Sequence, residues 1–137
     1  MKRLFIDTNI ILDLLAKRNP FYPAAARMFS MADKGELKLA ISSLSFANTH
    51  YILSGLKSRN EARLILRRFK VLVEVLPLND KIIELALNDE DFPDFEDAMQ
   101  YYTALEFQHQ IIISRNLKDF KNSKIPVLSA KEFLAKA

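Results

Sequence analysis

The chain has 137 residues, 50% of them apolar, and its 20 Lys and Arg against 17 Asp and Glu give a net charge of only +3. This length and apolar content are typical of one domain, residues 1–137, with a single core. The small net charge allows an anionic partner but lies well below that of a protein that coats nucleic acid. Because the chain has no cysteine, disulfides, thiolate zinc sites and cysteine nucleophiles are excluded.

The N-terminus predicts neither a signal peptide nor a membrane span. Lys2 and Arg3 precede an apolar stretch, but Asp7 and Asp13 interrupt it. We therefore expect a cytoplasmic protein that does not contact a membrane.

The first half of the chain alternates short apolar runs with segments at helical spacing. Asn19 and Pro20 break the first helix, and Gly35 ends the second. Ser43 or Ser45 is expected to cap the third helix. In chain order these elements are a strand at 3–7, a helix at 8–17, a helix at 20–35, a strand at 37–42 and a helix at 46–56.

The second half continues the alternation, and Ser129 is expected to cap the last helix. In chain order its elements are a helix at 60–70, a strand at 71–78, a helix at 79–89, a helix at 94–110, a strand at 111–116, a strand at 125–128 and a C-terminal helix. Strands that alternate with helices throughout predict an α/β fold, a three-layer α/β/α sandwich around a mostly parallel sheet of four to five strands.

Polar side chains follow the predicted strands, at the sheet edge where ligands of such folds collect. After the first and fourth strands these are Asp7, Thr8, Asn9, Ser114, Arg115 and Asn116. Asp119 lies just beyond the fourth strand, and Asp97 lies near the start of a helix. If the first and fourth strands are neighbours, Asp7, Asp97 and Asp119 converge.

Three convergent carboxylates repel one another unless a cation lies between them. Oxygen ligands suit the hard ions Mg²⁺ and Mn²⁺, which also bind substrate phosphates. Such an ion activates water and stabilises charge during phosphodiester hydrolysis. We therefore predict that Asp7, Asp97 and Asp119 hold Mg²⁺ or Mn²⁺.

Three segments, LFIDTNIILDLL, DFEDAMQYYTA and IISRNLKDF, resemble in order the motifs of the PIN-domain superfamily of metal-dependent ribonucleases, which includes the VapC-type toxins of bacterial toxin–antitoxin pairs. Asp7 and Asn9 match the first motif, Asp97 with Ala98 the later one, and Asp119 lies in the strand-end motif. The resemblance covers nearly the whole chain. It implies hydrolysis of single-stranded RNA, an antitoxin protein as a partner, and a homodimer.

Two positions depart from the family pattern. The family usually has a Glu on the helix after the second strand, where this chain offers Asn48 and no acid. Asn116 stands in place of the usual strand-end Asp, which leaves Asp119 as the substitute. Asn48 and Asn116 are then neutral ligands or supporting groups, and weaker metal affinity follows. The alternative function is a catalytically weakened PIN-like module that binds nucleic acid or protein.

Each acid also has a simpler interpretation. Asp7 and Asp94 can cap the helices that follow them, with a water-mediated metal role as the alternative for Asp94. Asp119 can form a turn or a local salt bridge. We expect Glu96 to be solvated and Asp13 to lie on the surface.

Basic residues define the expected nucleic-acid contacts. They line one face of the fourth helix and the loop after the fourth strand, at Arg59, Arg63, Arg67, Lys70, Arg115 and Lys118. Six of the nine residues from Asp89 to Asp97 are acidic, which predicts an acidic mouth with basic rims.

Two further expectations concern the dimer and the competing enzyme classes. We expect Phe21, Tyr22 and Met28 to supply the homodimer contact. A phosphatase of the haloacid-dehalogenase type needs Asp-x-Asp after the first strand, and Asn9 occupies the second position.

Overall fold

The structure is a computed structural model and describes residues 2–136. A five-stranded sheet in the order β3-β2-β1-β4-β5 forms its centre, and every pairing in it is parallel. The strands are β1 (Arg3–Ile6), β2 (Lys38–Ser42), β3 (Glu74–Leu76), β4 (Ile111–Ile113) and β5 (Val127–Leu128).

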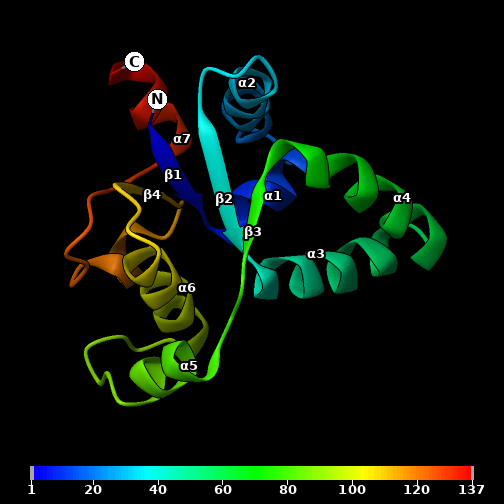
Figure 1. Ribbon diagram of the computed structural model, residues 1–137. Helices are drawn as coiled ribbons and strands as arrows, with labels where there is room; N and C mark the ends of the chain where they lie inside the picture. Colours follow the sequence, from blue (N-terminus) through cyan, green and yellow to red (C-terminus); the bar gives the residue numbers. More distant parts are fainter. Residues whose placement is uncertain (1, 137) are drawn as a thin grey trace.

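Helices cover both faces of the sheet, which confirms the predicted three-layer α/β sandwich (Figure 1). They are α1 (Thr8–Leu15), α2 (Tyr22–Asp33), α3 (Ser43–Leu56), α4 (Arg59–Phe69), α5 (Asp80–Leu87), α6 (Phe95–Glu106) and α7 (Ala130–Lys136), with short 3-10 helices η1 (Lys70–Leu72) and η2 (Leu117–Phe120). One layer contains α1, α2 and α7, and the other contains α5 and α6. The α3–α4 pair projects from the sheet as an arm (Figure 1).

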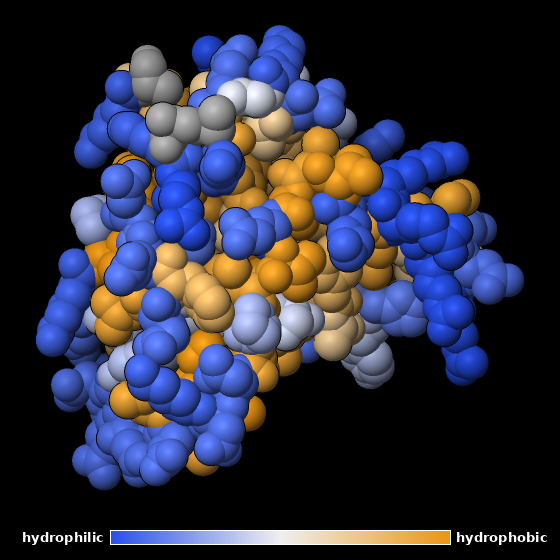
Figure 2. Space-filling view, viewed as in Figure 1, coloured by the Kyte–Doolittle hydropathy of each residue, from blue (hydrophilic) through white to orange (hydrophobic). Residues whose placement is uncertain are grey.

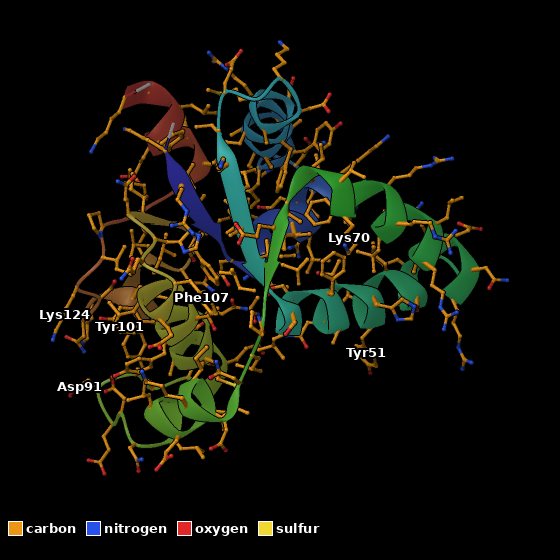
Figure 3. All side chains as sticks on the ribbon, in the orientation of Figure 1. Tyr51, Lys70, Asp91, Tyr101, Phe107 and Lys124 are labelled. Atoms are coloured by element: carbon orange, nitrogen blue, oxygen red, sulfur yellow. The ribbon has the colours of Figure 1, made fainter. Side chains whose placement is uncertain are left out.

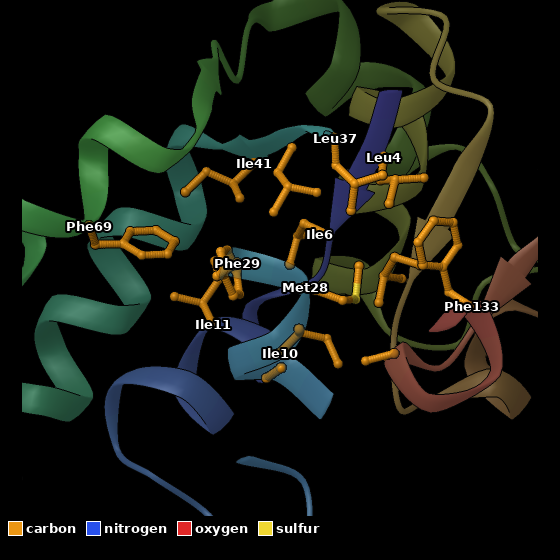
Figure 4. Close-up of a cluster of buried hydrophobic side chains, with 14 of the residues drawn as sticks. Leu4, Ile6, Ile10, Ile11, Met28, Phe29, Leu37, Ile41, Phe69 and Phe133 are labelled. Carbon is orange, nitrogen blue, oxygen red and sulfur yellow. The ribbon is translucent and has the colours of Figure 1, made fainter. Parts of the chain in front are cut away.

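Alternation along the strands divides the core between the two layers. Leu4 and Ile6 of β1 pack with α1 and α2, whereas Phe5 faces the α6 side. Figure 4 shows the first of these clusters, in which Phe69 anchors the base of the arm. Because a slip of one residue would exchange the two faces, this alternation fixes the register of β1.

Several predicted boundaries are wrong at the edges of elements. β3 is shorter than the expected strand because, at the edge of the sheet, it pairs only with Ala40–Ser42 of β2. The cap of α3 is Ser42, whose Oγ accepts the N–H of Leu44 at 3.1 Å, so neither Ser43 nor Ser45 is the cap.

Two other boundaries follow the predicted chemistry, and the end of α6 does not. Gly35 ends α2 with φ of 78°, a left-handed conformation that glycine adopts without strain. Ser129 caps α7 by accepting the N–H of Glu132 at 3.0 Å. The helix α6 ends at Glu106, before the predicted end, and Gln108 beyond it has φ of 58°.

The surface divides into charged and apolar regions. Figure 2 shows hydrophilic residues over the projecting end of the arm and over the α5–α6 region, with apolar residues between them. Within residues 2–136, every helix is too short or too polar to cross a membrane.

Candidate functional site

Asp7 lies directly after β1, at the carboxyl edge of the sheet, and is only 4% exposed. Because Ile6 pairs with Ile113 of β4, the next residues, Asp7 and Ser114, lie side by side. Ser114 Oγ donates to Asp7 Oδ2 at 2.8 Å. The N–H of Thr8 donates to Asp7 Oδ1 at 2.8 Å, so Asp7 does cap α1. Burial raises the pKa of Asp7, and the hydrogen bonds from Ser114 and Thr8 oppose that shift.

The first turn of α6 adds further carboxylates. Asp94 caps this helix, as predicted, by accepting the N–H of Asp97 at 2.9 Å. Asp97 lies half-buried within that turn. Burial, together with the charges of Asp7, Asp94, Asp119 and Glu96, raises the pKa of Asp97 to about 7. Negative charge is therefore concentrated at the start of α6.

Asp119 is held in place by the short helix η2. Its neighbour Phe120 is buried and packs edge-on against Phe92, with ring centroids 6.1 Å apart. The N–H of Asn116 donates to Ser114 Oγ at 3.0 Å, which ties the start of this segment to the end of β4. Both ends of η2 are thereby fixed, and Asp119 lines the same cleft as Asp7.

These side chains line one cleft of about 420 Å³. Its polar lining consists of the carboxylates Asp7, Asp94, Glu96, Asp97 and Asp119, the amides Asn9, Asn48 and Asn116, and Thr8. Within residues 2–136, no Lys or Arg lines this cleft. The structure therefore brings together the residues that the sequence predicts for the site, with Ser114 behind Asp7.

The donor set fits a hard divalent cation, because it consists of carboxylate, amide and hydroxyl oxygens. In the part of the chain that the structure describes, no group of three or more His, Asp or Glu side chains lies close enough together to hold a metal ion by itself. Mg²⁺ does not need one, since it keeps several waters and binds through one or two carboxylates plus a substrate phosphate. Asp7 and Asp97, which line the cleft together, could hold such an ion.

A buried polar cluster joins three elements beneath the cleft. Gln100 Nε2 of α6 donates to Thr8 Oγ1 and to Ser45 Oγ, each at 3.1 Å, and the two hydroxyls lie 2.8 Å apart. Gln100 and Ser45 are fully buried. Because Thr8 is adjacent to Asp7, this cluster fixes α1, α3 and α6 relative to one another.

Asp13 is 1% exposed, so the prediction that it lies on the surface is wrong. Arg115 donates to it through Nε at 2.9 Å and Nη2 at 3.0 Å, and Arg18 Nε lies 3.2 Å from Asp13 Oδ1. The Arg115 guanidinium also lies 3.9 Å from the centre of the Phe21 ring. These contacts compensate the buried charge of Asp13. They engage two nitrogens and one face of the Arg115 guanidinium.

The other predicted nucleic-acid contacts are exposed and lie outside the cleft. Arg59, Arg63 and Arg67 belong to α4, with Lys70 in η1 and Lys118 in η2. Lys70 is visible where the arm returns to the sheet in Figure 3. Arg59, the first residue of α4, lines a second pocket that shares Tyr51 and Ile52 with the lining of the cleft.

Sequence reasoning missed three features of this site. Tyr51, 81% exposed, projects from α3 at the cleft (Figure 3), and an isolated aromatic on a helix carries no sequence pattern that would reveal it. Glu96 is exposed, as expected, but it is not merely solvated, because it lines the cleft and accepts a hydrogen bond from Asn48. Gln100 and Ser45 meet only through the tertiary fold.

The expected dimer contact is wrong for one residue. Met28 is buried in the core, whereas Phe21 is exposed and Tyr22 is half-buried. Met28 therefore stabilises the packing of α2 on the sheet instead of offering an external contact.

The comparisons with known proteins agree with this fold. The PIN domain family matches residues 3–118, so the chain belongs to the PIN-domain family, and it is VapC-like. Ribonuclease VapC1 of Aquifex aeolicus (strain VF5) is 30% identical over 96% of this chain and 93% of its own length.

Solved structures show the same fold. VapBC2 from Rickettsia felis, bound to a DNA fragment from its promoter, matches with a TM-score of 0.69 at 21% identity over 93% of this chain and 97% of that chain. VapC20 of Mycobacterium tuberculosis, described as a Sarcin-Ricin loop cleaving toxin, matches with a TM-score of 0.69 at 18% identity over 89% of this chain and 95% of its own.

The raised pKa of Asp97 predicts a stability effect that depends on pH. The pKa of Asp97 is about 7 in the fold and 3.8 for an ordinary aspartate in water. Ionised Asp97 therefore destabilises the metal-free protein, increasingly between these two pH values and fully above the higher one. Asp97→Asn is expected to raise the free energy of unfolding by about 1 kcal/mol at about pH 8, a figure discounted because the side chain is partly exposed. The gain shrinks as the pH falls. Urea unfolding of the metal-free protein measures it.

Asp80→Asn is the matched control, since Asp80 also lies in the first turn of a helix but outside the cleft. No gain in stability is expected from it. A loss of stability in Asp97→Asn at high pH would show that the cleft does not hold uncompensated charge.

The Asp13 ion pair predicts a structural role for Arg115. Arg115→Ala is expected to lower the free energy of unfolding by about 2 kcal/mol, because it leaves a buried carboxylate with Arg18 alone. Lys118→Ala, in the same segment but exposed, is expected to change it by less than about 0.5 kcal/mol. Equal stabilities of the two variants in urea unfolding would contradict the structural role.

Proposed function

We propose that this protein is a metal-dependent endoribonuclease that hydrolyses phosphodiester bonds of single-stranded RNA with Mg²⁺ or Mn²⁺. One observation carries the proposal. A cleft at the carboxyl edge of a parallel sheet is lined by five carboxylates and, within residues 2–136, by no Lys or Arg. Kinship with Ribonuclease VapC1 of Aquifex aeolicus supports the reaction type.

In this proposal, Asp7, Asp97 and Asp119 hold the ion. A bound Mg²⁺ or Mn²⁺ supplies the activation of water and the stabilisation of charge on the phosphate. Ser114 and the N–H of Thr8 fix the orientation of the Asp7 carboxylate through their hydrogen bonds. Asp94 sets the start of α6 and acts on the ion through water, and Asn9 and Asn116 offer neutral polar atoms to the cleft.

The RNA backbone is proposed to run along the arm into the cleft. Arg59, Arg63 and Arg67 are exposed on α4, and Tyr51 lines both the cleft and the pocket that Arg59 lines. Arginine contacts to phosphate position a nucleic acid without reading its sequence. Lys70 and Lys118 extend this surface, whereas the pairing of Arg115 with Asp13 favours a structural role for that residue.

We also propose an antitoxin protein as a partner and assembly as a homodimer. Complexes such as VapBC2 from Rickettsia felis and a toxin–antitoxin complex from Klebsiella pneumoniae share the fold, which supports the first of these proposals. An antitoxin that covers the cleft would exclude RNA from the carboxylates.

The proposed activity predicts cleavage of unstructured RNA that depends on both Mn²⁺ and Asp7. Asp7→Asn is expected to lower the cleavage rate by about 100-fold or more, because it removes the most buried carboxylate of the ion site. EDTA is expected to abolish cleavage, and added Mn²⁺ to restore it. The measurement is cleavage of a labelled unstructured RNA on a denaturing gel.

Asp80→Asn serves as the control for removal of a carboxylate outside the cleft, and it should leave the rate unchanged. The amides Asn48 and Asn116 motivate the alternative, a PIN-like module that binds nucleic acid or protein without turnover. RNA that is bound but stays intact with Mn²⁺, in the wild type as in Asp7→Asn, would favour that module and reject the nuclease.

The proposed RNA path predicts a change in salt dependence. In the Asp7→Asn background, which keeps RNA intact, replacing Arg59, Arg63 and Arg67 with Ala is expected to weaken RNA binding. The slope of log K against log salt should fall by about 2, because each phosphate contact on a single strand contributes roughly 0.7. Fluorescence anisotropy over a salt series measures both quantities.

The control removes the same number of positive charges elsewhere, by replacing Arg27, Lys34 and Lys38 with Ala. These residues are exposed and lie outside the α3–α4 arm. An equal loss of affinity and slope in both variants would mean that net charge, and not the surface of α4, governs RNA binding.

A further inference from the structure

Glu96 and Asn48 meet at the cleft from two different helices. Asn48 Nδ2, on α3, donates to Glu96 Oε1, on α6, at 2.8 Å. Both side chains line the cleft together with Asp7 and Asp97. The family pattern leads one to expect an acid at the position of Asn48, but α3 supplies none. The carboxylate beside Asn48 comes instead from Glu96 of α6.

We propose that Glu96 is a ligand of the divalent ion, replacing the acid absent from α3, and that Asn48 orients it for this role. The inference rests on the proposed metal-dependent function and specifies which residues of this chain complete the site. Asn48 is then a positioning residue, and Glu96 is the carboxylate that contacts the ion.

The hydrogen bond favours this assignment because it leaves one carboxylate oxygen available. Oε1 accepts the amide of Asn48, whereas Oε2 has no hydrogen-bond partner among the side chains and backbone of residues 2–136. An amide donor holds a carboxylate without competing for the cation, since its nitrogen is no metal ligand. An acid at position 48 would instead repel Glu96.

Electrostatics supports the same placement. Glu96, Asp7 and Asp97 line the same cleft, so their negative charges repel one another. A cation bound in the cleft would reduce this repulsion, and Glu96 adds to the negative charge that favours the cation. A purely structural interpretation, in which Glu96 only ties α6 to α3, predicts no effect on metal affinity.

The test compares Mn²⁺ binding by the purified variants, with free Mn²⁺ measured by electron paramagnetic resonance. Glu96→Gln keeps the shape and an acceptor for Asn48 but removes the charge, and it is expected to weaken Mn²⁺ binding about tenfold or more. Asn48→Ala, which removes only the donor, should weaken binding less. Glu36→Gln removes an exposed Glu next to the start of β2, at the opposite edge of the sheet, and should bind as the wild type does.

Rescue separates an ion ligand from a tie between helices. Adding Asn48→Glu to Glu96→Gln returns a carboxylate to the cleft from α3, and it is expected to restore most of the lost Mn²⁺ affinity. Failure of this rescue would contradict the exchange of acids between the helices. Thermal unfolding of the metal-free variants checks that each one is folded.

The outcomes distinguish this inference from the function on which it rests. If Asp97→Asn loses Mn²⁺ binding while Glu96→Gln keeps the wild-type affinity, Glu96 is not a ligand and the proposed nuclease stands. If the wild type binds no Mn²⁺ and cleaves no RNA, both proposals are overturned.

Discussion

Parallel pairing of β1 with β4 is the constraint on which the cleft depends. The register that places Ile6 beside Ile113 also places Asp7 beside Ser114, so one side chain is held by the residue that ends the neighbouring strand. The helix α1 follows β1 and η2 follows β4 at this edge of the sheet, and α6, which precedes β4, begins at the same edge. Carboxylates distant in sequence therefore share one small volume, and burial together with their mutual repulsion raises the pKa of Asp97 to about 7.

Two buried acids near the start of the chain differ in how the fold compensates their negative charge. Asp13 is paired with Arg115 and lies close to Arg18, whereas the hydrogen bonds that Asp7 accepts within residues 2–136 come from the Ser114 hydroxyl and the N–H of Thr8. The fold thus compensates one buried carboxylate with arginine and leaves the other to the cleft. Uncompensated buried charge is unfavourable for stability, so its retention at one place indicates a functional site.

The sequence allowed prediction of the layers, the parallel sheet and most of the cleft, because these follow from apolar periodicity and from polar residues after buried strands. Asp7, Asp94 and Asp97 occupy the places that local rules assign them. Asp13 was misjudged because its helical position resembles a surface position, and only the tertiary fold brings Arg115 to it. The link from Gln100 to Ser45 spans 55 residues, and no local pattern encodes it.

Counting acids by their motif positions underestimates the charge of this cleft. On that count the chain lacks the acid of α3 and has Asn116 in place of another, which implies a weakened site. In three dimensions Glu96 lies against Asn48, and Asp119 reaches the cleft from η2, so five carboxylates line it. A cation responds to the field of all these groups and not to the helix that carries each of them. The charge available to an ion is therefore a property of the fold, and the two amides do not by themselves indicate a lost activity.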